Sequence, residues 1–302
     1  MEKQYSIFHI EGGLGKHVAA TAVARAIKKN HSDRDLIVVC AYPEIYVNLP
    51  FVSRVYKHGY TPYFYQDYIK GKDFLMFKHE PYFTTEHLKK EMSLIENWCN
   101  LYNIEYSGEL PEIIFNYRQQ QYNHNLWARS KPIFLIQTNG GPLEEQPYPY
   151  SWTRDIPPYI NDHIVNVFKN THHIIQICRN DSQAINSPYV EVINKPLSNM
   201  ELFGLVQMSD KRLLIDSSLQ HASMALKKES VVLWIGTSPK IFGYDFHRNI
   251  TANLNDDEFK LPDSYIFDYN FNGTLHECPV INQTTMFDIE EIINTLKTDK
   301  LV

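Results

Sequence analysis

The sequence predicts an α/β protein made of two Rossmann-like domains, each a parallel sheet flanked by helices. Short apolar runs of strand length alternate with segments of helical spacing in both halves of the chain. Two of these runs, Tyr5–Ile10 and Ile133–Gln137, end in loops that contain glycine pairs. The chain has 302 residues, which is enough for about two domains with separate cores. We therefore expect one domain over residues 1–130 and a second over residues 131–302.

The N-terminal domain is expected to open with a βαβ unit. Tyr5–Ile10 is the first strand, and Val18–Lys29 has the apolar spacing of a helix with a basic end. Leu36–Cys40 is a continuous apolar run of the kind that is buried in a parallel sheet. From Tyr60 to Asn125 the pattern is less regular, and the order of its strands stays open.

Two segments of this middle region carry a prediction. Thr85–Leu101 has the pattern of one amphipathic helix, capped by Thr84 or Thr85. The tyrosine cluster Tyr60–Tyr68 is expected to pack in the core of the N-terminal domain, with stacking on a sugar or a base as the alternative.

The C-terminal half repeats the alternation of strands and helices that a parallel sheet requires. A strand at Ile133–Gln137 is followed by the loop Thr138–Pro142. The later predicted elements are, in order, helix Tyr159–Phe168, strand His173–Cys178, strand Leu213–Ile215, helix Leu219–Lys227, strand Val231–Ile235 and helix Phe287–Leu296.

Composition narrows the classes of protein. Hydrophobic residues make up 43% and the net charge is −6, so no overall positive field attracts a nucleic acid backbone. The four cysteines are isolated, which disfavours a disulfide framework and a zinc site. The longest apolar run, Leu36–Tyr42, is too short to cross a bilayer, and the N-terminus has no signal-peptide pattern. We expect a cytoplasmic protein without a transmembrane segment.

The first candidate site is the glycine loop Glu11–Val18 between the first strand and the first helix. Glycines let a ligand approach the backbone, and a helix N-terminus favours an oxyanion or a phosphate. The segment is neither a Walker loop nor a dinucleotide fingerprint, because Ile10, His17 and Val18 stand where those motifs need other residues. The plain alternative is a turn that only connects strand and helix.

The second candidate site combines two strand ends in the C-terminal half. Asp216–Leu226 follows one strand, with Ser217 or Ser218 as the helix cap and His221 in the first turn. Gly236–Pro239 follows the next strand, with Thr237 or Ser238 as the cap. Ligands of parallel α/β sheets bind at this carboxyl edge, so a diphosphate would fit there. The plain alternative is a pair of ordinary capped helices.

These C-terminal motifs resemble the heptosyltransferase-like glycosyltransferases, the family that includes the ADP-heptose:lipopolysaccharide heptosyltransferases. Thr21–Ile27 and Asn48–Val55 are similar to the family's first βαβ unit, and Glu277–Cys278 with Met286–Ile292 resembles its tail. The resemblance is most specific over residues 196–296, and residues 60–131 match no family pattern.

The resemblance implies the GT-B architecture, in which two Rossmann-like domains face each other across a cleft. It implies transfer of a sugar from a nucleotide-diphosphate-sugar donor, without a cofactor or a metal, to a hydroxyl acceptor such as a saccharide. The N-terminal domain would bind the acceptor and the C-terminal domain the donor, with packing of the last helix on the N-terminal domain as one arrangement.

The resemblance also assigns residues. Arg154, in the segment Ser151–Pro157, takes the place of a phosphate-facing lysine of the family, and the alternative is a surface pair with Asp155. The residues expected around the donor diphosphate are Ser217, Ser218, His221, Gly236, Thr237 and Arg154, with Asp216, Thr138 and Asn139 beside them and Gly12, Gly13 and Gly15 in the N-terminal loop.

The sequence departs from the family at two positions. Ser218 stands where the family usually has glycine, and His17 aligns with an aspartate that is thought to act as the acceptor's general base. A histidine can accept a proton near neutral pH, so His17 is the candidate catalytic base. The same loop also resembles other GT-B enzymes, in which it contacts phosphates. Asp33–Asp35 matches a metal-binding D-x-D pattern, but its place between helix and strand indicates a turn.

Two alternative functions stay open. Loss of the family aspartate would fit a catalytically inactive homologue that binds nucleotide sugars. A glycosyltransferase of the phage type, acting on a modified base in DNA, would have the same architecture, although the net negative charge disfavours a DNA partner.

Overall fold

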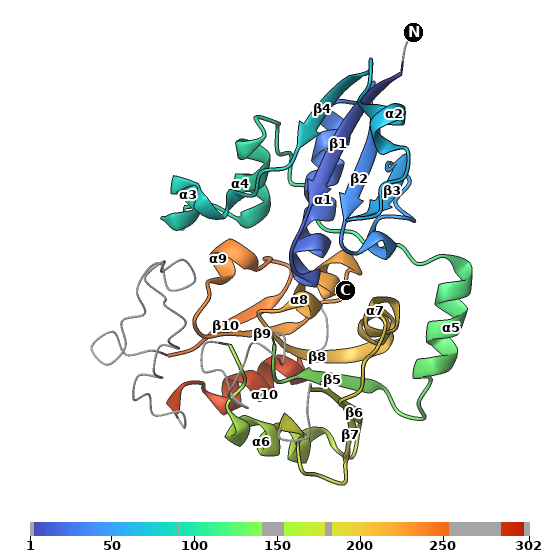
Figure 1. Cartoon of the computed structure of the whole chain (residues 1–302). Helices are drawn as coiled ribbons and strands as arrows, with labels where there is room; N and C mark the ends of the chain where they lie inside the picture. The colour runs from blue at the N-terminus through green and yellow to red at the C-terminus, as the bar shows by residue number, and fades with distance from the viewer. Residues whose placement is uncertain (1–2, 90, 141–153, 179–182, 254–284, 299–302) are drawn as a thin grey trace. The chain divides into compact units, whose positions relative to one another are not determined.

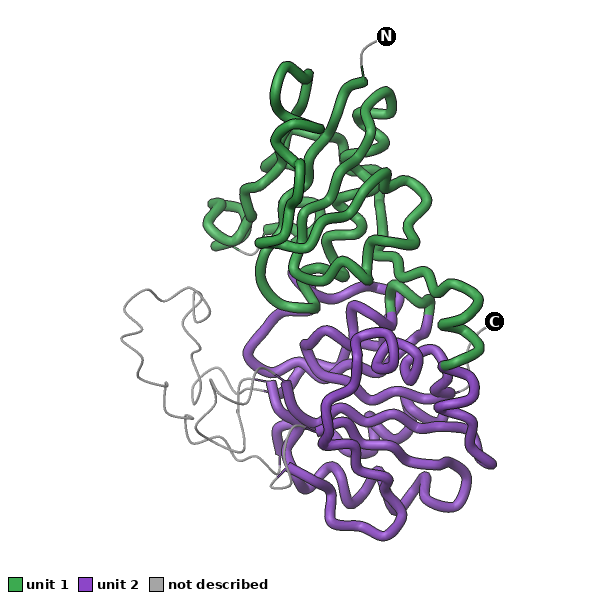
Figure 2. Tube along the Cα trace, turned by 45° about the vertical axis from the view of Figure 1, so that its right-hand side comes forward, with its two compact units in different colours: residues 1–122, 224–227 green, residues 123–223, 228–302 purple. Residues whose placement is uncertain are grey.

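The computed structural model describes residues 3–89, 91–140, 154–178, 183–253 and 285–298 (Figure 1). The sequence motifs at 142–153 and at Glu277–Cys278 lie outside the described residues. The chain forms two compact units, which are residues 1–122 with 224–227 and residues 123–223 with 228–302 (Figure 2). Both contain a parallel sheet with helices, so the predicted fold class is confirmed.

Unit 1 holds a four-stranded parallel sheet. Strands β1 (Gln4–Ile10), β2 (Asp35–Cys40), β3 (Arg54–Lys57) and β4 (Asp73–Phe77) lie in the order β3-β2-β1-β4. Helix α1 (Leu14–Asn30) connects the two strands that the sequence predicted, and it begins four residues before the predicted start. The short strand β3, which was not predicted, and β4, from the region whose strand order stayed open, complete a sheet with the 3-2-1-4 order of a Rossmann half.

The region predicted as one helix over Thr85–Leu101 forms two. Thr84 caps α3 (Thr85–Leu88) by accepting a hydrogen bond from the His87 N–H at 3.2 Å. Ser93 starts a new helix, α4 (Leu94–Leu101), by the same kind of cap. The Asn97 side chain of α4 donates to the Thr84 hydroxyl at 2.7 Å, so the second helix is bonded to the start of the first. The prediction of a single helix was therefore wrong.

The other short elements of unit 1 connect strands or cover the sheet. They are η1 (Pro43–Ile45), α2 (Phe64–Tyr68), η2 (Pro81–Phe83) and α5 (Tyr117–Trp127), the last of which crosses the boundary between the units.

The tyrosine cluster of unit 1 is divided between core and surface. The Tyr68 ring meets the Tyr5 ring edge-on at 5.0 Å and also contacts Tyr56. Tyr60 and Tyr63 are 72% and 77% exposed. The expected core packing holds for the end of the segment and not for its beginning.

Unit 2 holds a six-stranded parallel sheet in the order β10-β9-β8-β5-β6-β7. Its strands are β5 (Ile133–Gln137), β6 (His173–Ile177), β7 (Val190–Ile193), β8 (Ser209–Ile215), β9 (Val231–Trp234) and β10 (Arg248–Thr251). Numbered within the unit, this order is 3-2-1-4-5-6, the complete order of a Rossmann fold.

Among the described residues of unit 2, five helices connect or cover the strands. They are α6 (Pro158–Phe168), α7 (Asn199–Met208), α8 (Ser218–Ala225), α9 (Pro239–Phe242) and α10 (Ile289–Lys297). Ile292 and Leu296 of α10 belong to the same buried cluster as Ile160 and Ile164 of α6. These contacts place the last helix in the core of unit 2.

No helix in the described part of the chain combines the length and the apolar character needed to cross a bilayer.

A close approach of α5 and α7 generates the first prediction. A Cβ added at Gly204 would lie 2.2–2.5 Å from side-chain atoms of Asn123. Asn123 is buried, and its side chain donates a hydrogen bond to the Met200 carbonyl at 3.2 Å. Gly204→Ala should therefore lower the free energy of unfolding by about 1–3 kcal/mol, although alanine normally favours a helix over glycine. Urea unfolding of the variant measures this change.

Asn123→Ala provides the matched control for Gly204→Ala, because it removes the atoms with which the new methyl collides. In the double variant the alanine at 204 should cost less than it does alone. Equal costs in both backgrounds would contradict the proposed collision.

Candidate functional site

Both sheets have a switch point, where connections from neighbouring strands leave toward opposite faces. In unit 2 it lies between β5 and β8, followed by Thr138–Gly140 and Asp216–Ser218. In unit 1 it lies between β1 and β4, followed by Glu11–Gly13 and Lys78–Glu80. Ligands of open parallel sheets bind in such crevices at the carboxyl ends of the strands. The predicted site residues of each unit therefore lie at the carboxyl edge of its sheet.

A buried carboxylate organises the end of β5. Asp155 accepts hydrogen bonds from the Asn139 side chain and from the Gly140 N–H, both at 3.3 Å. The Ile156 N–H donates to the Thr138 carbonyl at 2.9 Å. These contacts hold the segment that contains Arg154 against the end of β5.

Arg154 lies across Gly140 at this edge. A Cβ at Gly140 would come within 3.2 Å of both Arg154 Cδ and Ile215 Cδ1, and within 3.8 Å of Ser217 Cβ. The absence of a side chain at Gly140 therefore leaves space for the aliphatic part of Arg154 near the end of β8. Burial raises the pKa of Asp216, while the Arg154 charge and the Thr237 hydroxyl lower it. Arg154, Asp216 and Thr237, predicted from three separate segments, thus lie close enough to interact.

Ser217 links β5 to the start of α8. Its hydroxyl donates to Gln137 Oε1 and accepts from the Leu219 N–H at 3.2 Å, as a helix cap does. Ser218 is the first residue of α8 and is half-buried. The sequence analysis missed Gln137, whose only signal was a polar residue at the last position of a buried strand.

Gly236 and Thr237 follow β9, the neighbour of β8. Of the two predicted caps of the next helix, Ser238 is the one that caps α9, by accepting from the Lys240 N–H at 3.3 Å. Thr237 lies at the end of β9 near Asp216, and its buried hydroxyl has no hydrogen-bond partner among the described residues.

His221 is buried in unit 2 and bonded to other residues of that unit. Its Nδ1 lies 2.7 Å from the Tyr244 hydroxyl, and the Gln220 amide lies 3.1–3.2 Å from both ring nitrogens. Burial, with a smaller effect of the His247 charge, lowers the pKa of His221 to about 3. His221 is therefore neutral at pH 7, so a contact with an anion would be a hydrogen bond and not an ion pair.

The glycine loop of unit 1 carries a lysine that the sequence analysis did not select. Gly12 has a φ of 96°, and a Cβ there would lie 2.6 Å from Lys16 Nζ. Lys16 pairs with Glu80 at 2.7 Å, so the ion pair joins the two sides of the unit 1 switch point. Gly13 is the N-cap of α1 without a capping side chain, and Gly15 lies in the first turn. The loop thus combines an N-terminus of a long helix with a cation.

His17 is buried, and both of its ring nitrogens are engaged. Nδ1 lies 3.0 Å from the Gly13 carbonyl, and Nε2 accepts from the Ala41 N–H at 3.2 Å. Burial lowers the pKa of His17, which favours the neutral tautomer that these two contacts require. His17 thereby ties the glycine loop to the end of β2, and in this arrangement neither nitrogen is left to accept a proton from an acceptor hydroxyl.

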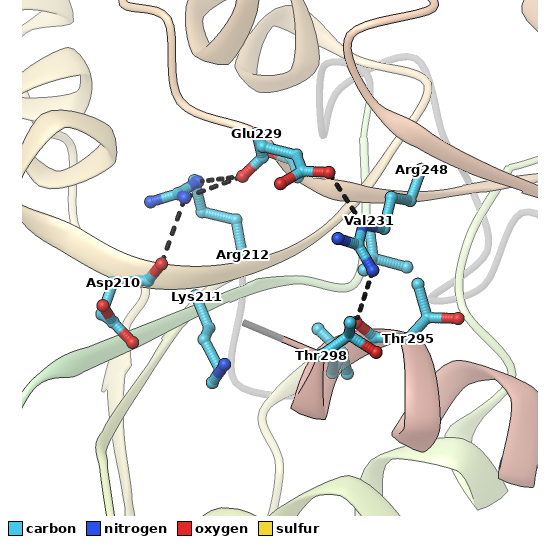
Figure 3. A pocket seen from close by; sticks show the side chains of 10 residues that line it. Asp210, Lys211, Arg212, Glu229, Val231, Arg248, Thr295 and Thr298 are labelled. Atoms are coloured by element: carbon cyan, nitrogen blue, oxygen red, sulfur yellow. Dashed lines mark hydrogen bonds and ion pairs between the residues drawn. The ribbon is translucent and has the colours of Figure 1, made fainter. Parts of the chain in front are cut away.

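A cavity of about 320 Å³ lies at the opposite, amino edge of the unit 2 sheet (Figure 3). Arg212 donates to the carbonyls of Asp210 and Glu229, and Arg248 pairs with the Glu229 carboxylate at 2.7 Å. Burial lowers the pKa of Arg212 to about 10, so this arginine is still charged at pH 7. These charges hold strand ends together, and none of the predicted site residues lines this cavity.

The two backbone contacts of His17 predict a structural effect of its removal. His17→Ala would leave the Gly13 carbonyl and the Ala41 N–H without this partner, at a cost of about 1–3 kcal/mol in the free energy of unfolding. Urea unfolding measures the loss, and His79→Ala, at an exposed histidine of the same unit, is the control. Equal stability of the two variants would contradict the structural role.

The buried histidines of unit 2 predict an acid-sensitive stability. The pKa values of His221 and His247 are lowered to about 3 and about 4, so below about pH 6.5 the unfolded chain binds protons that the folded chain does not. The free energy of unfolding should fall as the pH drops from about 6.5 to about 5, by up to about 1.4 kcal/mol per pH unit for each histidine. Urea unfolding across this range measures the slope.

The His221→Gln, His247→Gln double variant should show a shallower slope in the same range of pH. A steep slope that survives in this variant would assign the effect to other groups.

Comparison with known proteins finds similarity in structure and not in sequence. No family model matches the chain, and no curated protein sequence is significantly similar to it. Among solved structures, a family 9 glycosyltransferase from Veillonella parvula superposes with a TM-score of 0.65 at 11% identity, over 97% of this chain and 95% of its own.

Two further structures are named as heptosyltransferases. ADP-heptose lipopolysaccharide heptosyltransferase II of Escherichia coli has a TM-score of 0.60 at 10% identity, over 83% of this chain and 91% of its own. The iron-containing heptosyltransferase TibC from enterotoxigenic E. coli, in complex with ADP-D-β-D-heptose, has a TM-score of 0.65 at 12% identity, over 98% of this chain and 77% of its own. The chain therefore has the fold of these glycosyltransferases, as the sequence motifs predicted.

Proposed function

We propose that this protein is a glycosyltransferase that moves a sugar from a nucleotide-diphosphate-sugar donor to a hydroxyl acceptor, with a saccharide as the acceptor class. The observation that supports this most is the gathering of Arg154, Asp216, Ser217 and Thr237 at the switch point of the unit 2 sheet. The reaction class is supported by solved structures of similar fold that are named as heptosyltransferases, one of them in complex with ADP-D-β-D-heptose.

The donor diphosphate would bind at the N-terminus of α8. The first amides of this helix are available in part because Ser217 caps only the Leu219 N–H in the described contacts. Arg154 would add a bidentate contact to the phosphate oxygens. These groups would stabilise the negative charge that develops on the leaving diphosphate, so we propose that the donor step needs no metal ion.

Asp216 has a different role in this proposal. An uncompensated carboxylate that pointed at the diphosphate would repel it, and here the nearby Arg154 charge compensates Asp216 in part. We propose that Asp216 orients the arginine and does not contact the phosphates. His221 is buried and neutral, and its contact with Tyr244 would hold the first turn of α8 in place.

The acceptor hydroxyl must lose a proton during transfer. The base role of His17 stays a prediction, and it would require the contacts with Gly13 and Ala41 to break. The arrangement described above supports a positioning role, in which His17 fixes the glycine loop. Loss of a base lowers kcat by about a hundredfold or more with little change in stability, whereas loss of a positioning residue lowers both.

Nucleotide binding without metal tests the donor site. In the presence of a chelator, ADP, UDP or GDP at about 100 times its Kd should stabilise the protein by about 2.7 kcal/mol, measured as a thermal shift. Arg154→Ala should weaken binding roughly tenfold or more, because it removes a charged partner of the phosphates.

Lys211→Ala is the matched control, since it removes a positive charge at the amino edge of the same sheet (Figure 3). Its nucleotide affinity should equal that of the wild type. A thermal shift that requires Mg²⁺ or Mn²⁺, or equal weakening by the two variants, would contradict the proposed donor site.

A further inference from the structure

Three potential metal ligands gather at the carboxyl edge of the unit 1 sheet, and the fold explains why. His9 is paired in register with Val39 of β2, and Val39 with Tyr56 of β3. Side chains alternate along a strand, so His58, two residues after Tyr56, is expected on the same face of the sheet as His9. Glu11, two residues after His9, extends this row beyond the end of β1.

This face of the sheet is apolar along most of the strands and polar at their carboxyl ends. Tyr5, Ile7, Ile37, Val39 and Tyr56 form one buried cluster on it. His9, Glu11 and His58 follow this apolar cluster toward the carboxyl ends of the strands. Their position at the carboxyl edge, and not in the core, is the place where a parallel sheet binds ligands.

The distances within the group suit a shared ion. Glu11 Oε1 lies 3.2 Å from His58 Nε2 and 3.7 Å from His9 Nδ1, and one ligand atom from each residue lies within 4.8 Å of the others. Ligand atoms around a tetrahedral zinc ion are roughly 3.4 Å apart, given metal–nitrogen bonds of about 2.1 Å. The His58 and Glu11 side chains are 49% and 53% exposed, so they can close the small remaining difference by changing rotamer.

His9 provides an independent observation. Its Nδ1 is buried and has no hydrogen-bond partner among the described residues, although it faces the Glu11 carboxylate. A buried polar atom without a partner costs about 1–3 kcal/mol, and a metal ion between the two groups would satisfy it. The nearby charges of Lys78 and Glu80 have opposite signs, so they offset each other in part.

We propose that His9 Nδ1, His58 Nε2 and the Glu11 carboxylate bind one divalent transition metal ion, with Zn²⁺ as the preferred ion. Two imidazoles favour this class, since Mg²⁺ and Ca²⁺ prefer ligand sets made of oxygen alone. Three protein ligands leave at least one coordination position for water or for an oxygen atom of a bound molecule. The site lies within unit 1, is independent of the proposed donor site, and holds no part of the diphosphate in the proposal above.

Metal titration of the full chain tests this site. After treatment with a chelator, calorimetry with Zn²⁺ in the absence of nucleotide should show one ion per chain with a Kd on the order of 1 μM or below. Co²⁺ should bind at the same site and report its coordination through visible absorption. His58→Ala and Glu11→Gln should each weaken Zn²⁺ binding roughly tenfold or more and change the Co²⁺ spectrum.

The variants are chosen so that a folding defect cannot imitate the result. His58 and Glu11 are about half exposed, and circular dichroism of the metal-free variants should match the wild type. His124→Ala, at an exposed histidine of α5, is the control for binding to surface histidines and should leave the affinity unchanged.

Three results would overturn the proposal. They are no stoichiometric Zn²⁺ binding, wild-type affinity in His58→Ala and Glu11→Gln, and equal loss of affinity in His124→Ala. Because the titration contains no nucleotide, its failure would leave the donor site untouched, and a failed nucleotide shift would leave this site untouched.

Discussion

The parallel direction of all strands in the two described sheets is the constraint on which the rest of the structure depends. It collects all carboxyl ends at one edge of each sheet, and the order of the strands then fixes where neighbouring connections separate. Residues as distant in sequence as Thr138, Arg154, Ser217 and Thr237 come together for this reason. The same constraint brings the glycine loop of unit 1 to the segment that carries Glu80, which pairs with Lys16. Polar side chains can accumulate at these edges because the strands behind them are buried and apolar.

The carboxyl edges of the two sheets differ in how charged groups are placed near the core. In unit 2 the Asp155 carboxylate is buried and bonded to Asn139 and Gly140, so its charge is used to shape a loop. At the same edge, the Arg154 charge lowers the pKa of Asp216, which burial raises. In unit 1 the polar group at His9, Glu11 and His58 is more open, and it holds a nitrogen atom that the described residues leave without a hydrogen bond. The edge of unit 2 places Arg154 near the N-terminus of α8, a combination of positive charge and helix N-terminus that suits a diphosphate.

The sequence predicted the long, buried elements well, because continuous apolar runs such as Ile133–Gln137 report burial on both faces of a strand directly. It did not predict β3 and left the strand order around β4 open, because both strands are short and half-exposed and their patterns carry little signal. The predicted helix over Thr85–Leu101 failed for a related reason: helical spacing continues across the break, and only the Ser93 cap marks it. For the site, motif spacing found the residues at the strand ends, but it could not show that His17 and His221 use their nitrogens within the protein. That depends on Ala41 and Tyr244, which lie far away in sequence.

The crossing of Arg154 over Gly140 has a consequence for how the sequence can vary. A Cβ at position 140 would lie 3.2 Å from both the Arg154 stem and Ile215, so a side chain there requires these neighbours to shift by a few tenths of an ångström. A protein of this fold with a larger residue at position 140 is therefore expected to have a shorter side chain at position 154.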